Sequence, residues 1–304
     1  MKLKKVAMGI TVVMASSLLL VGCGSSDDSS KDKKSTDTKQ TETKKTAKTD
    51  GTMTDGTMTD GTYKLEEKNF DDKGWKGFMS IEVKDGKITK ANYDYKNKDG
   101  KLKSEDADYE KAMKDKVGTG PQEYLKQLSD SLVKNQSAAS VEVVSGATHS
   151  SDAFINYANQ LIQAAQKADT TTISINNLAK MEDGTYKLEE QNYAHGYRVV
   201  FSMDVKDGKI TKSDYNYVDK DGKLKSDDAD YEKNMKAKSG TGPKEYIPAL
   251  NKSLVEKQDV AAVDTVSGAT NSSNQFKIYA AQLQNAAQNG NTDTIKVYNL
   301  VEAE

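Results

Sequence analysis

The sequence predicts an α+β protein built from two tandem copies of one small domain, each with a mainly antiparallel sheet and several helices. The first observation is an internal duplication: Asp-Gly-Thr-Tyr-Lys-Leu-Glu-Glu begins at Asp60 and again at Asp183. Val-Ser-Gly-Ala-Thr likewise begins at Val144 and returns at Val266. The second observation is that strand-like alternation opens each copy and helical spacing closes it. The spacing from Asp60 to Asp183 has the size of a whole domain, so we expect a tandem pair and not a solenoid.

The N-terminal 22 residues have the three parts of a bacterial signal sequence. Lysines at positions 2, 4 and 5 precede an apolar run over 6–20, which is shorter than the roughly 20 residues of a membrane span. The run ends in Leu-Val-Gly-Cys, which resembles a lipobox and contains the only cysteine, Cys23. The resemblance implies that 1–22 is a cleaved signal peptide. It also implies that Cys23 carries the lipid anchor, on the extracellular face of the cell membrane of a Gram-positive bacterium. An ordinary secretory signal with a chance cysteine is the alternative.

Residues 23–59 are predicted to form the lipid anchor and a disordered tether. They are mostly Ser, Thr, Lys, Asp and Gly, with almost no large apolar side chain. Such a segment cannot bury enough surface to offset the entropy lost on ordering. A coil of this length could reach roughly 120 Å fully stretched and would average nearer 35 Å. The two domains then follow at 60–178 and 183–300.

Each copy opens with three predicted strands. In the first copy they cover 61–65, 78–83 and 87–95, where apolar residues alternate with polar ones. The Asp-Gly pair at 85–86, which recurs in the second copy, favours a two-residue hairpin turn because both positions tolerate positive φ. The second and third strands are therefore expected to pair antiparallel.

Helices are predicted in the later part of each copy. A polar segment with Tyr109 and Met113 comes first, and Pro121 suits the first turn of a helix over 122–135. The last helix follows Ser-Gly-Ala-Thr, where apolar residues recur at helical spacing: Phe154, Ala158, Leu161 and Ala165.

The composition excludes several classes of function. The chain has 44 basic and 46 acidic residues, and cleavage of the three signal lysines would leave a net charge of −5. Nucleic acid is therefore not an expected partner, since phosphate contacts need a basic surface. One cysteine excludes a disulfide within the chain, and only two histidines argue against a histidine metal site. No catalytic triad emerges, so we expect neither a catalytic residue nor a bound metal.

One heptapeptide is the candidate for chemistry in both copies. It is an acidic residue, two spacers and Ser-Gly-Ala-Thr, from Glu142 to Thr148 and from Asp264 to Thr270. Its small residues let another molecule approach the backbone closely, and the two serines that follow each threonine are predicted N-caps. A phosphate attached to the threonine would face free N–H groups and the positive end of the helix dipole. The alternative is a helix-entry turn kept only by duplication.

The heptapeptide resembles the flavinylation motif of FMN-binding domains, as in peripheral subunits of sodium-pumping and Rnf-type redox complexes. In that family an ApbE-type flavin transferase uses FAD and a divalent metal to join FMN through its phosphate to the last threonine. The resemblance implies two covalent FMN groups, on Thr148 and Thr270. The first copy departs from the pattern because glutamate replaces the usual aspartate. The other residues implied in cofactor binding are Glu142, Asp264, Ser145, Gly146, Ala147, Ser267, Gly268 and Ala269.

The layout of lipobox, tether and two domains resembles the flavinylated lipoproteins of Gram-positive extracellular electron transfer over essentially the whole chain. This resemblance implies an electron carrier and not an enzyme with its own substrate. Electrons would pass from a quinone-linked membrane donor through FMN to ferric iron or another extracellular acceptor. The alternatives are a solute-binding lipoprotein of a transporter and a structural surface stalk. Two small repeats argue against the first, and a stalk would need neither motif.

Three further features each have two interpretations. Trp75, with Tyr197 at the matching place, is expected either to stack on the flavin ring or to lie in the core. Gly-Thr-Gly at 118–120, repeated in the second copy, either lends N–H groups to the flavin or forms a plain loop. His149 adjoins the first threonine, but Asn271 replaces it in the second copy, so a shared mechanism cannot need it.

Overall fold

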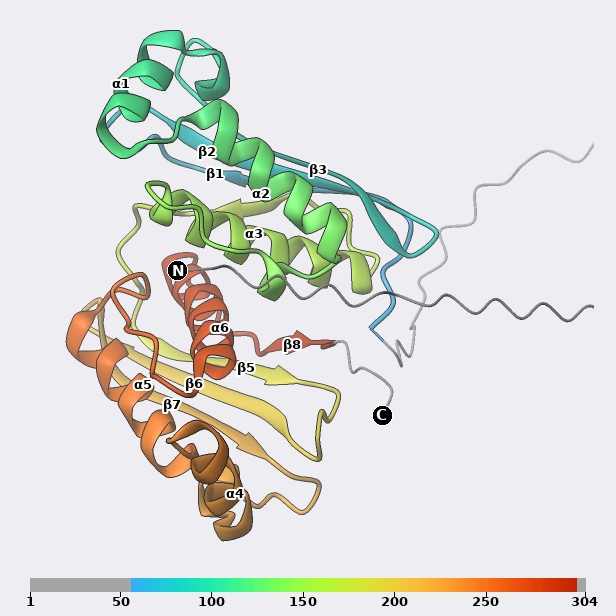
Figure 1. Cartoon of the computed structure of the whole chain (residues 1–304), viewed down its shortest axis with the longest axis vertical. Coiled ribbons are helices and arrows are strands. Elements are labelled where there is room, and N and C mark those ends of the chain that lie inside the picture. Colours follow the sequence, from blue (N-terminus) through green and yellow to red (C-terminus); the bar gives the residue numbers. More distant parts are fainter. Residues whose placement is uncertain (1–55, 300–304) are drawn as a thin grey trace, which may run out of the picture. The chain divides into compact units, whose positions relative to one another are not determined.

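A computed structural model describes residues 56–299, which lie within one compact unit. It shows two copies of the same arrangement of strands and helices (Figure 1). The predicted fold class is confirmed, because each copy is a small α+β domain with a four-stranded sheet. The elements of the first repeat are β1 (Gly61–Glu67), β2 (Lys76–Lys84), β3 (Lys87–Lys96), α1 (Ala107–Val117), α2 (Pro121–Asn135), α3 (Thr148–Gln166) and β4 (Ile173–Ile175). Those of the second are β5 (Gly184–Glu190), β6 (Arg198–Lys206), β7 (Lys209–Val218), α4 (Ala229–Ser239), α5 (Pro243–Lys257), α6 (Thr270–Gln288) and β8 (Ile295–Val297).

Each sheet is mixed, with three antiparallel strands and one short parallel strand at the edge. The strand order is β3-β2-β1-β4 in the first repeat and β7-β6-β5-β8 in the second. The β2–β3 hairpin turns at Asp85 and Gly86, whose φ angles of 52° and 70° fit the predicted two-residue turn. β4 pairs parallel with β1 and was not predicted, because three residues are too few for an alternating pattern to show.

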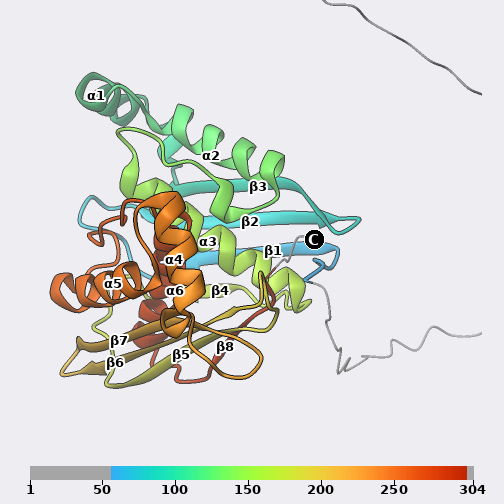
Figure 2. The ribbon, with the colours of Figure 1, turned by 60° about the horizontal axis from the view of Figure 1, so that its bottom comes forward.

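The core of each repeat lies between its sheet and its two longer helices. On β1, Tyr63 and Leu65 are buried, whereas Thr62 and Lys64, which alternate with them, are exposed. α2 and α3 cover the buried face in the first repeat (Figures 1 and 2), and Phe154 of α3 is fully buried there. The other face is largely polar, which is the usual pattern of an antiparallel sheet with one solvated side.

Helix boundaries follow the predicted chemistry with one exception. Asp106 caps α1 by accepting a backbone N–H of its first turn at 3.0 Å, and Gly118 ends α1 with a left-handed φ of 82°. Pro121 is the first residue of α2, as predicted. α3 and α6 begin at Thr148 and Thr270 themselves, so the prediction that the serines after them are N-caps is wrong. The motif turn reaches helical geometry before those serines.

Packed structure begins before the predicted start of the first domain. Met58, which the sequence analysis assigns to the tether, is buried in the core of the first repeat. Nearby, the Gln166 side chain donates a hydrogen bond to the Gly56 carbonyl at 2.8 Å. The remainder of the tether, the signal peptide and Cys23 lie outside the described residues. Over 56–299, no helix has the length and apolarity needed to cross a membrane.

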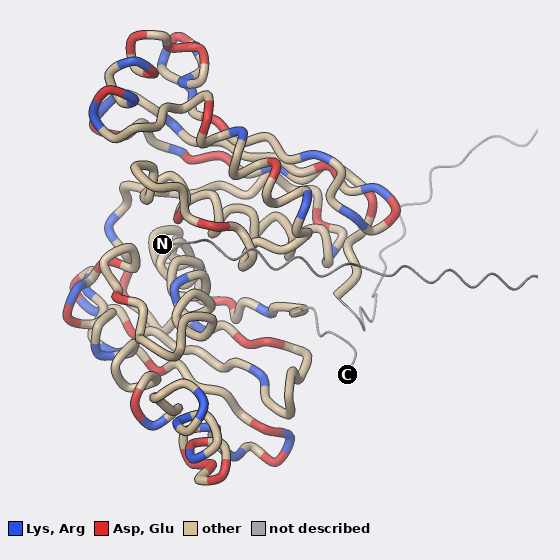
Figure 3. The backbone as a smooth tube through the Cα atoms, in the orientation of Figure 1, with Lys and Arg blue, Asp and Glu red and all other residues tan. Residues whose placement is uncertain are grey.

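Charged residues of both signs are interspersed along the described chain (Figure 3). Several form exposed ion pairs, such as Lys90 with Glu82 at 3.3 Å on neighbouring strands. This mixture contrasts with the single-signed basic surface that nucleic-acid binding requires.

The two repeats contact each other through α3 and α6. Side-chain amides make these contacts: Asn156 donates to Asn285 at 3.0 Å, and Gln282 donates to Asn159 at 2.8 Å. The helices that carry the two copies of the motif are therefore direct neighbours within this unit.

Candidate flavin-attachment site

The motif of the first repeat forms a tight turn that leads directly into α3. The Ala147 N–H donates to the Val144 carbonyl at 2.9 Å, and Gly146 at the third position has a φ of +81°. This backbone conformation favours glycine. The second repeat repeats the turn, with a φ of +78° at Gly268. The central glycine of each motif is thus required by local geometry.

The same glycines also permit a close approach to a neighbouring helix. A Cβ atom on Gly146 would lie 2.7 Å from the carbonyl oxygen of Val117, the last residue of α1. A Cβ atom on Gly268 would meet the carbonyl oxygen of Ser239 at the end of α4 even more closely. Each motif turn is therefore seated on the C-terminal end of the first helix of its repeat.

A buried serine fixes the turn from inside the helix. The Ser151 hydroxyl accepts from the Val144 N–H at 3.0 Å and donates to the Ala147 carbonyl at 2.9 Å. Ser273 makes the equivalent pair of bonds in the second repeat. This serine therefore joins both ends of the turn, and it does not cap the helix as predicted. The first N–H groups of a helix have no intrahelical acceptor. The N–H groups from Thr148 onward in the first turn therefore point out of the N-terminal end of α3.

Both motif threonines are exposed at the first position of a 19-residue helix. Neither α3 nor α6 has an acidic residue in its first turn, so the positive end of each helix dipole is uncompensated there. An anion bonded to either hydroxyl would lie beside that positive end. At Thr148 and Thr270, an exposed hydroxyl and a helix N-terminus thus lie together.

The remaining predicted residues surround this point unequally. Ser145 and Ser267 are exposed, whereas Ala147 and Ala269 are buried and anchor the turn. The acidic residues of the two motifs, Glu142 and Asp264, are also exposed. Asp264 pairs with the Lys257 ammonium at 2.6 Å, and this hydrogen bond lowers the pKa of the Asp264 carboxyl.

Thr148 borders a cleft of about 790 Å³, a volume within the usual range of small-molecule sites. Glu142 lines the same cleft, and so do Asn271 and Lys277 from α6. The first turn of α6 thus faces the space beside the first threonine, although Thr270 itself does not line it. The exposed hydroxyl, the uncompensated helix end and the adjacent space together fit a flavin nucleotide joined through phosphate.

The other features noted in the sequence lie in the core or in connections. Trp75 and Tyr197 are 6% and 8% exposed, so both are core residues. In the segment 118–120, Gly118 ends α1 and Gly120 precedes α2, where the Glu110 carboxylate accepts the Gln122 N–H at 3.0 Å. The plain-loop interpretation accounts for these contacts.

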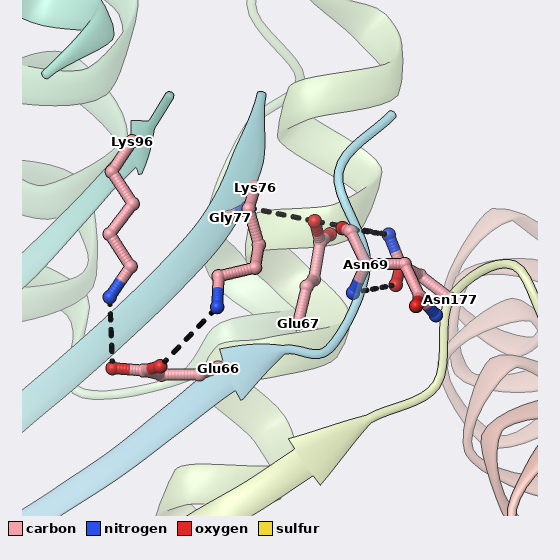
Figure 4. A network of polar contacts seen from close by, with 7 residues as sticks. All are labelled: Glu66, Glu67, Asn69, Lys76, Gly77, Lys96 and Asn177. Carbon is pink, nitrogen blue, oxygen red and sulfur yellow. Dashed lines mark hydrogen bonds and ion pairs between the residues drawn. The ribbon is translucent and has the colours of Figure 1, made fainter. Parts of the chain in front are cut away.

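Sequence reasoning missed a buried glutamate in each repeat. Glu67 accepts the Gly77 N–H at 2.8 Å, and Asn177 donates to it at 3.2 Å (Figure 4). It also accepts from the Tyr157 hydroxyl. Burial raises the pKa of this carboxyl. Glu190 is held in the same way in the second repeat, where burial again raises its pKa. The signal was present, because Glu67 continues the buried alternation of its strand.

It also missed a buried lysine in each repeat. Lys103 and Lys225 are 6% and 8% exposed and lie among aromatic rings that include Trp75 and Tyr197. Both lysines belong to an identical pentapeptide, Gly-Lys-Leu-Lys-Ser, which begins at residues 100 and 222. That identity was the available signal. Among residues 56–299, no group of three or more His, Cys, Asp or Glu side chains is placed to bind a metal.

Two tandem α+β domains, each presenting an exposed threonine where a long helix begins, define a duplicated cofactor-binding protein. The chain belongs to the FMN-binding domain family, which residues 74–163 and 195–284 match and which thereby covers more than half of the sequence.

Individual relatives each match a stretch of this chain about as long as one repeat. The 15 kDa lipoprotein of Treponema pallidum (strain Nichols) is 36% identical over 111 residues, which are 36% of this chain and 79% of that protein. A Clostridium perfringens protein of known crystal structure is 38% identical and covers 39% of this chain and 98% of its own, with a TM-score of 0.38. A Clostridium thermocellum protein solved by NMR is 28% identical and covers 38% and 95%, with a TM-score of 0.24.

Proposed function

We propose that this protein is a lipid-anchored extracellular electron carrier that holds FMN covalently on Thr148 and Thr270. The observation that supports the proposal is the motif turn. In both repeats of this FMN-binding protein, the turn leaves a threonine exposed at the start of a long helix. A lipid on Cys23 would hold the chain at the membrane, and the lipoprotein name of the Treponema relative supports that anchor. In this layout the protein resembles PplA, a flavinylated lipoprotein of Gram-positive bacteria.

The attachment reaction uses one atom of each threonine. The Thr148 Oγ1 atom would bond to the flavin-side phosphorus of FAD as the phosphoanhydride bond breaks, with AMP leaving and the hydroxyl proton released. A separate ApbE-type flavin transferase, with its divalent metal, would catalyse this step. The chain contributes an exposed hydroxyl on a turn that Gly146 and Ser151 hold in one conformation.

The chain's backbone would then hold the attached phosphate. The first N–H groups of α3 and α6 have no carbonyl partner within their helices and can donate to phosphate oxygens. The helix dipole adds a favourable interaction with the negative charge, typically about 0.3–1 kcal/mol at an exposed helix end. Attachment and anion binding therefore occur at the same place.

When bound, FMN would supply reversible acceptance of electrons. Oxidation of one quinol by the membrane donor releases two electrons and two protons, and two ferric ions accept those two electrons. The residues of this chain attach the cofactor and set its electrostatic surroundings. We therefore infer a carrier between a quinone-linked donor and an extracellular acceptor, and not an enzyme with its own substrate turnover.

The test is to measure the mass of the protein after expression with and without a flavin transferase. We expect two FMN-phosphoryl additions in the wild type, one in Thr148→Val or Thr270→Val, and none in the double variant. Valine keeps the branched shape and removes the hydroxyl. Thr62→Val, on the exposed face of β1, is the matched control and should keep both additions.

Function is followed with the same variants. The folded double variant should lose ferric-iron reduction by a quinol-linked donor, while the control retains it. Flavin addition at other residues, or undiminished iron reduction by a folded double variant without flavin, would refute the proposal. Cys23→Ala should release the flavin-bearing protein from membranes, and an undiminished membrane fraction would refute the anchor.

A further inference from the structure

Each repeat buries one lysine ammonium inside an aromatic cage, a term used here for the three rings around that ammonium. The Lys103 Nζ lies 4.4 Å from the ring centroid of Tyr95, 4.5 Å from that of Tyr109 and 5.7 Å from that of Trp75. In the second repeat the corresponding distances from the Lys225 Nζ are 4.5 Å to Tyr217, 4.0 Å to Tyr231 and 5.2 Å to Tyr197. Ring faces attract a cation, and more strongly when it is removed from water.

Within residues 56–299, neither ammonium forms an ion pair with a carboxylate, and the contacts of both are with aromatic rings. Asp94 contacts the segment that carries Lys103, but there it accepts from the hydroxyl and N–H of Ser104. In the second repeat Asn216 replaces that aspartate, yet Lys225 stays caged. The cage is therefore built around the cation without depending on this acid.

The buried glutamate of each repeat is hydrogen-bonded to other groups and not to the lysine. The Glu67 oxygens accept from the Gly77 N–H and the Tyr157 hydroxyl. Burying a cation without a bonded anion is unfavourable. A negative group near the cage would therefore stabilise the buried ammonium.

One ring of the cage is linked to the helix that follows the motif turn. The Tyr95 hydroxyl contacts the Tyr93 hydroxyl, which donates to the Ser150 carbonyl at 3.4 Å, two residues after Thr148. In the second repeat the Tyr217 hydroxyl bonds to the Gln275 side chain in the second turn of α6. The fold thus connects each caged cation to a predicted FMN attachment point.

We propose that Lys103 and Lys225 are the cations that favour the reduced form of the FMN attached in their own repeat. Two-electron reduction with uptake of one proton from water would leave one added negative charge on the flavin, and a buried positive charge attracts it more strongly than an exposed one does. The inference rests on the proposed function, because it takes Thr148 and Thr270 as the attachment points. Each lysine thereby raises the reduction potential of its own flavin.

The test measures reduction potentials in proteins that carry one flavin each. A Thr270→Val background leaves only the first flavin, and a spectroscopic titration with dithionite gives its potential. In this background Lys103→Met should lower the equilibrium constant for two-electron reduction of the flavin at least tenfold. This corresponds to a fall of about 30 mV in the reduction potential. Lys103→Arg keeps the charge and should stay near the parent. Lys98→Met removes an exposed charge on the β3–α1 connection and is the matched control.

The second repeat gives an independent replicate. In a Thr148→Val background, Lys225→Met should lower the potential of the second flavin, while Lys209→Met on an exposed position should not. Lys225→Met should leave the first flavin unchanged when the second threonine is absent. An unchanged potential in both cage variants, at equal flavin load, would overturn the inference.

A second substitution covers the case in which the methionine variants fail to fold. Lys103→Gln keeps a polar side chain but removes the positive charge, so in the one-flavin protein it should lower the potential as Lys103→Met does. A folded, flavin-loaded Lys103→Gln protein with the potential of its parent would overturn the inference.

Mass analysis separates failure of this inference from failure of the proposed function. Flavin joined to Thr148 with no effect of Lys103 overturns the inference alone. FMN that binds without a bond to Thr148, yet shows the same dependence on Lys103, overturns the attachment and supports the role of the lysine. A protein that holds no FMN, whether or not it is expressed with the flavin transferase, overturns both the inference and the proposed function.

Discussion

Replacing the motif glycine by alanine tests whether packing, and not only flavin attachment, requires it. In Gly146→Ala the new Cβ would lie 2.7 Å from the Val117 carbonyl oxygen, on a residue whose φ is +81°. The matched control is Gly118→Ala, whose φ is +82° and whose Cβ would meet nothing within 4 Å. The two variants share the backbone strain and differ in the steric contact.

The expected magnitudes follow from these two contributions. A left-handed conformation costs an alanine about 1–2 kcal/mol relative to glycine, and this applies to both variants. Forcing an atom into occupied space costs typically about 1–3 kcal/mol more, because the turn or the end of α1 must shift. We therefore expect Gly146→Ala to reduce the free energy of unfolding by about 2–5 kcal/mol and Gly118→Ala by about 1–2 kcal/mol.

The assay can report on the first repeat alone. Trp75 is the only tryptophan of the chain, is 6% exposed and packs edge-on against Tyr109 at 5.9 Å. Its fluorescence during urea unfolding of the flavin-free full chain therefore follows this repeat. Equal losses of unfolding free energy for Gly146→Ala and Gly118→Ala, with equal slopes, would refute the steric argument.

Three further predictions concern the same site and its surroundings. Ser151→Ala leaves the Val144 N–H buried without its acceptor, so urea unfolding should show a loss of about 1–3 kcal/mol; a change within error would contradict the role of this hydroxyl. Because burial raises the native pKa of Glu67 above the ordinary value of a glutamate, the native state binds more protons than the unfolded state between these two pKa values. Stability is thus lost as pH rises through the native pKa. Glu67→Gln should remove this loss in unfolding curves across pH, and parallel profiles would show that Glu67 does not titrate there. Asp264→Asn breaks only an exposed pair with Lys257 and should leave the urea midpoint unchanged, so any loss of flavin mass would report recognition by the transferase.

The predicted strands and helices all formed where an element was long enough to show a period. The hairpin at 85–86 and Pro121 at the first position of α2 depend on local chemistry, and the structure confirms both. The parallel strand β4 was missed because its three residues are too few to show an alternating pattern. The start of α3 was misplaced because Ser151, a good N-cap by type, bonds back to the turn from within the helix.

By itself the sequence determined the duplication, the order of elements and the two motif threonines, since these depend on local pattern and repetition. It also placed Gly146 in the heptapeptide that precedes a predicted helix. Only the tertiary structure decided that this glycine touches Val117, and that Lys103 lies in a cage of rings drawn from three separate segments. Such contacts join residues far apart along the chain, and no local period or propensity records which of them will meet. They arise when the sheet and helices pack, because packing must fill space and decide which buried charges find a partner.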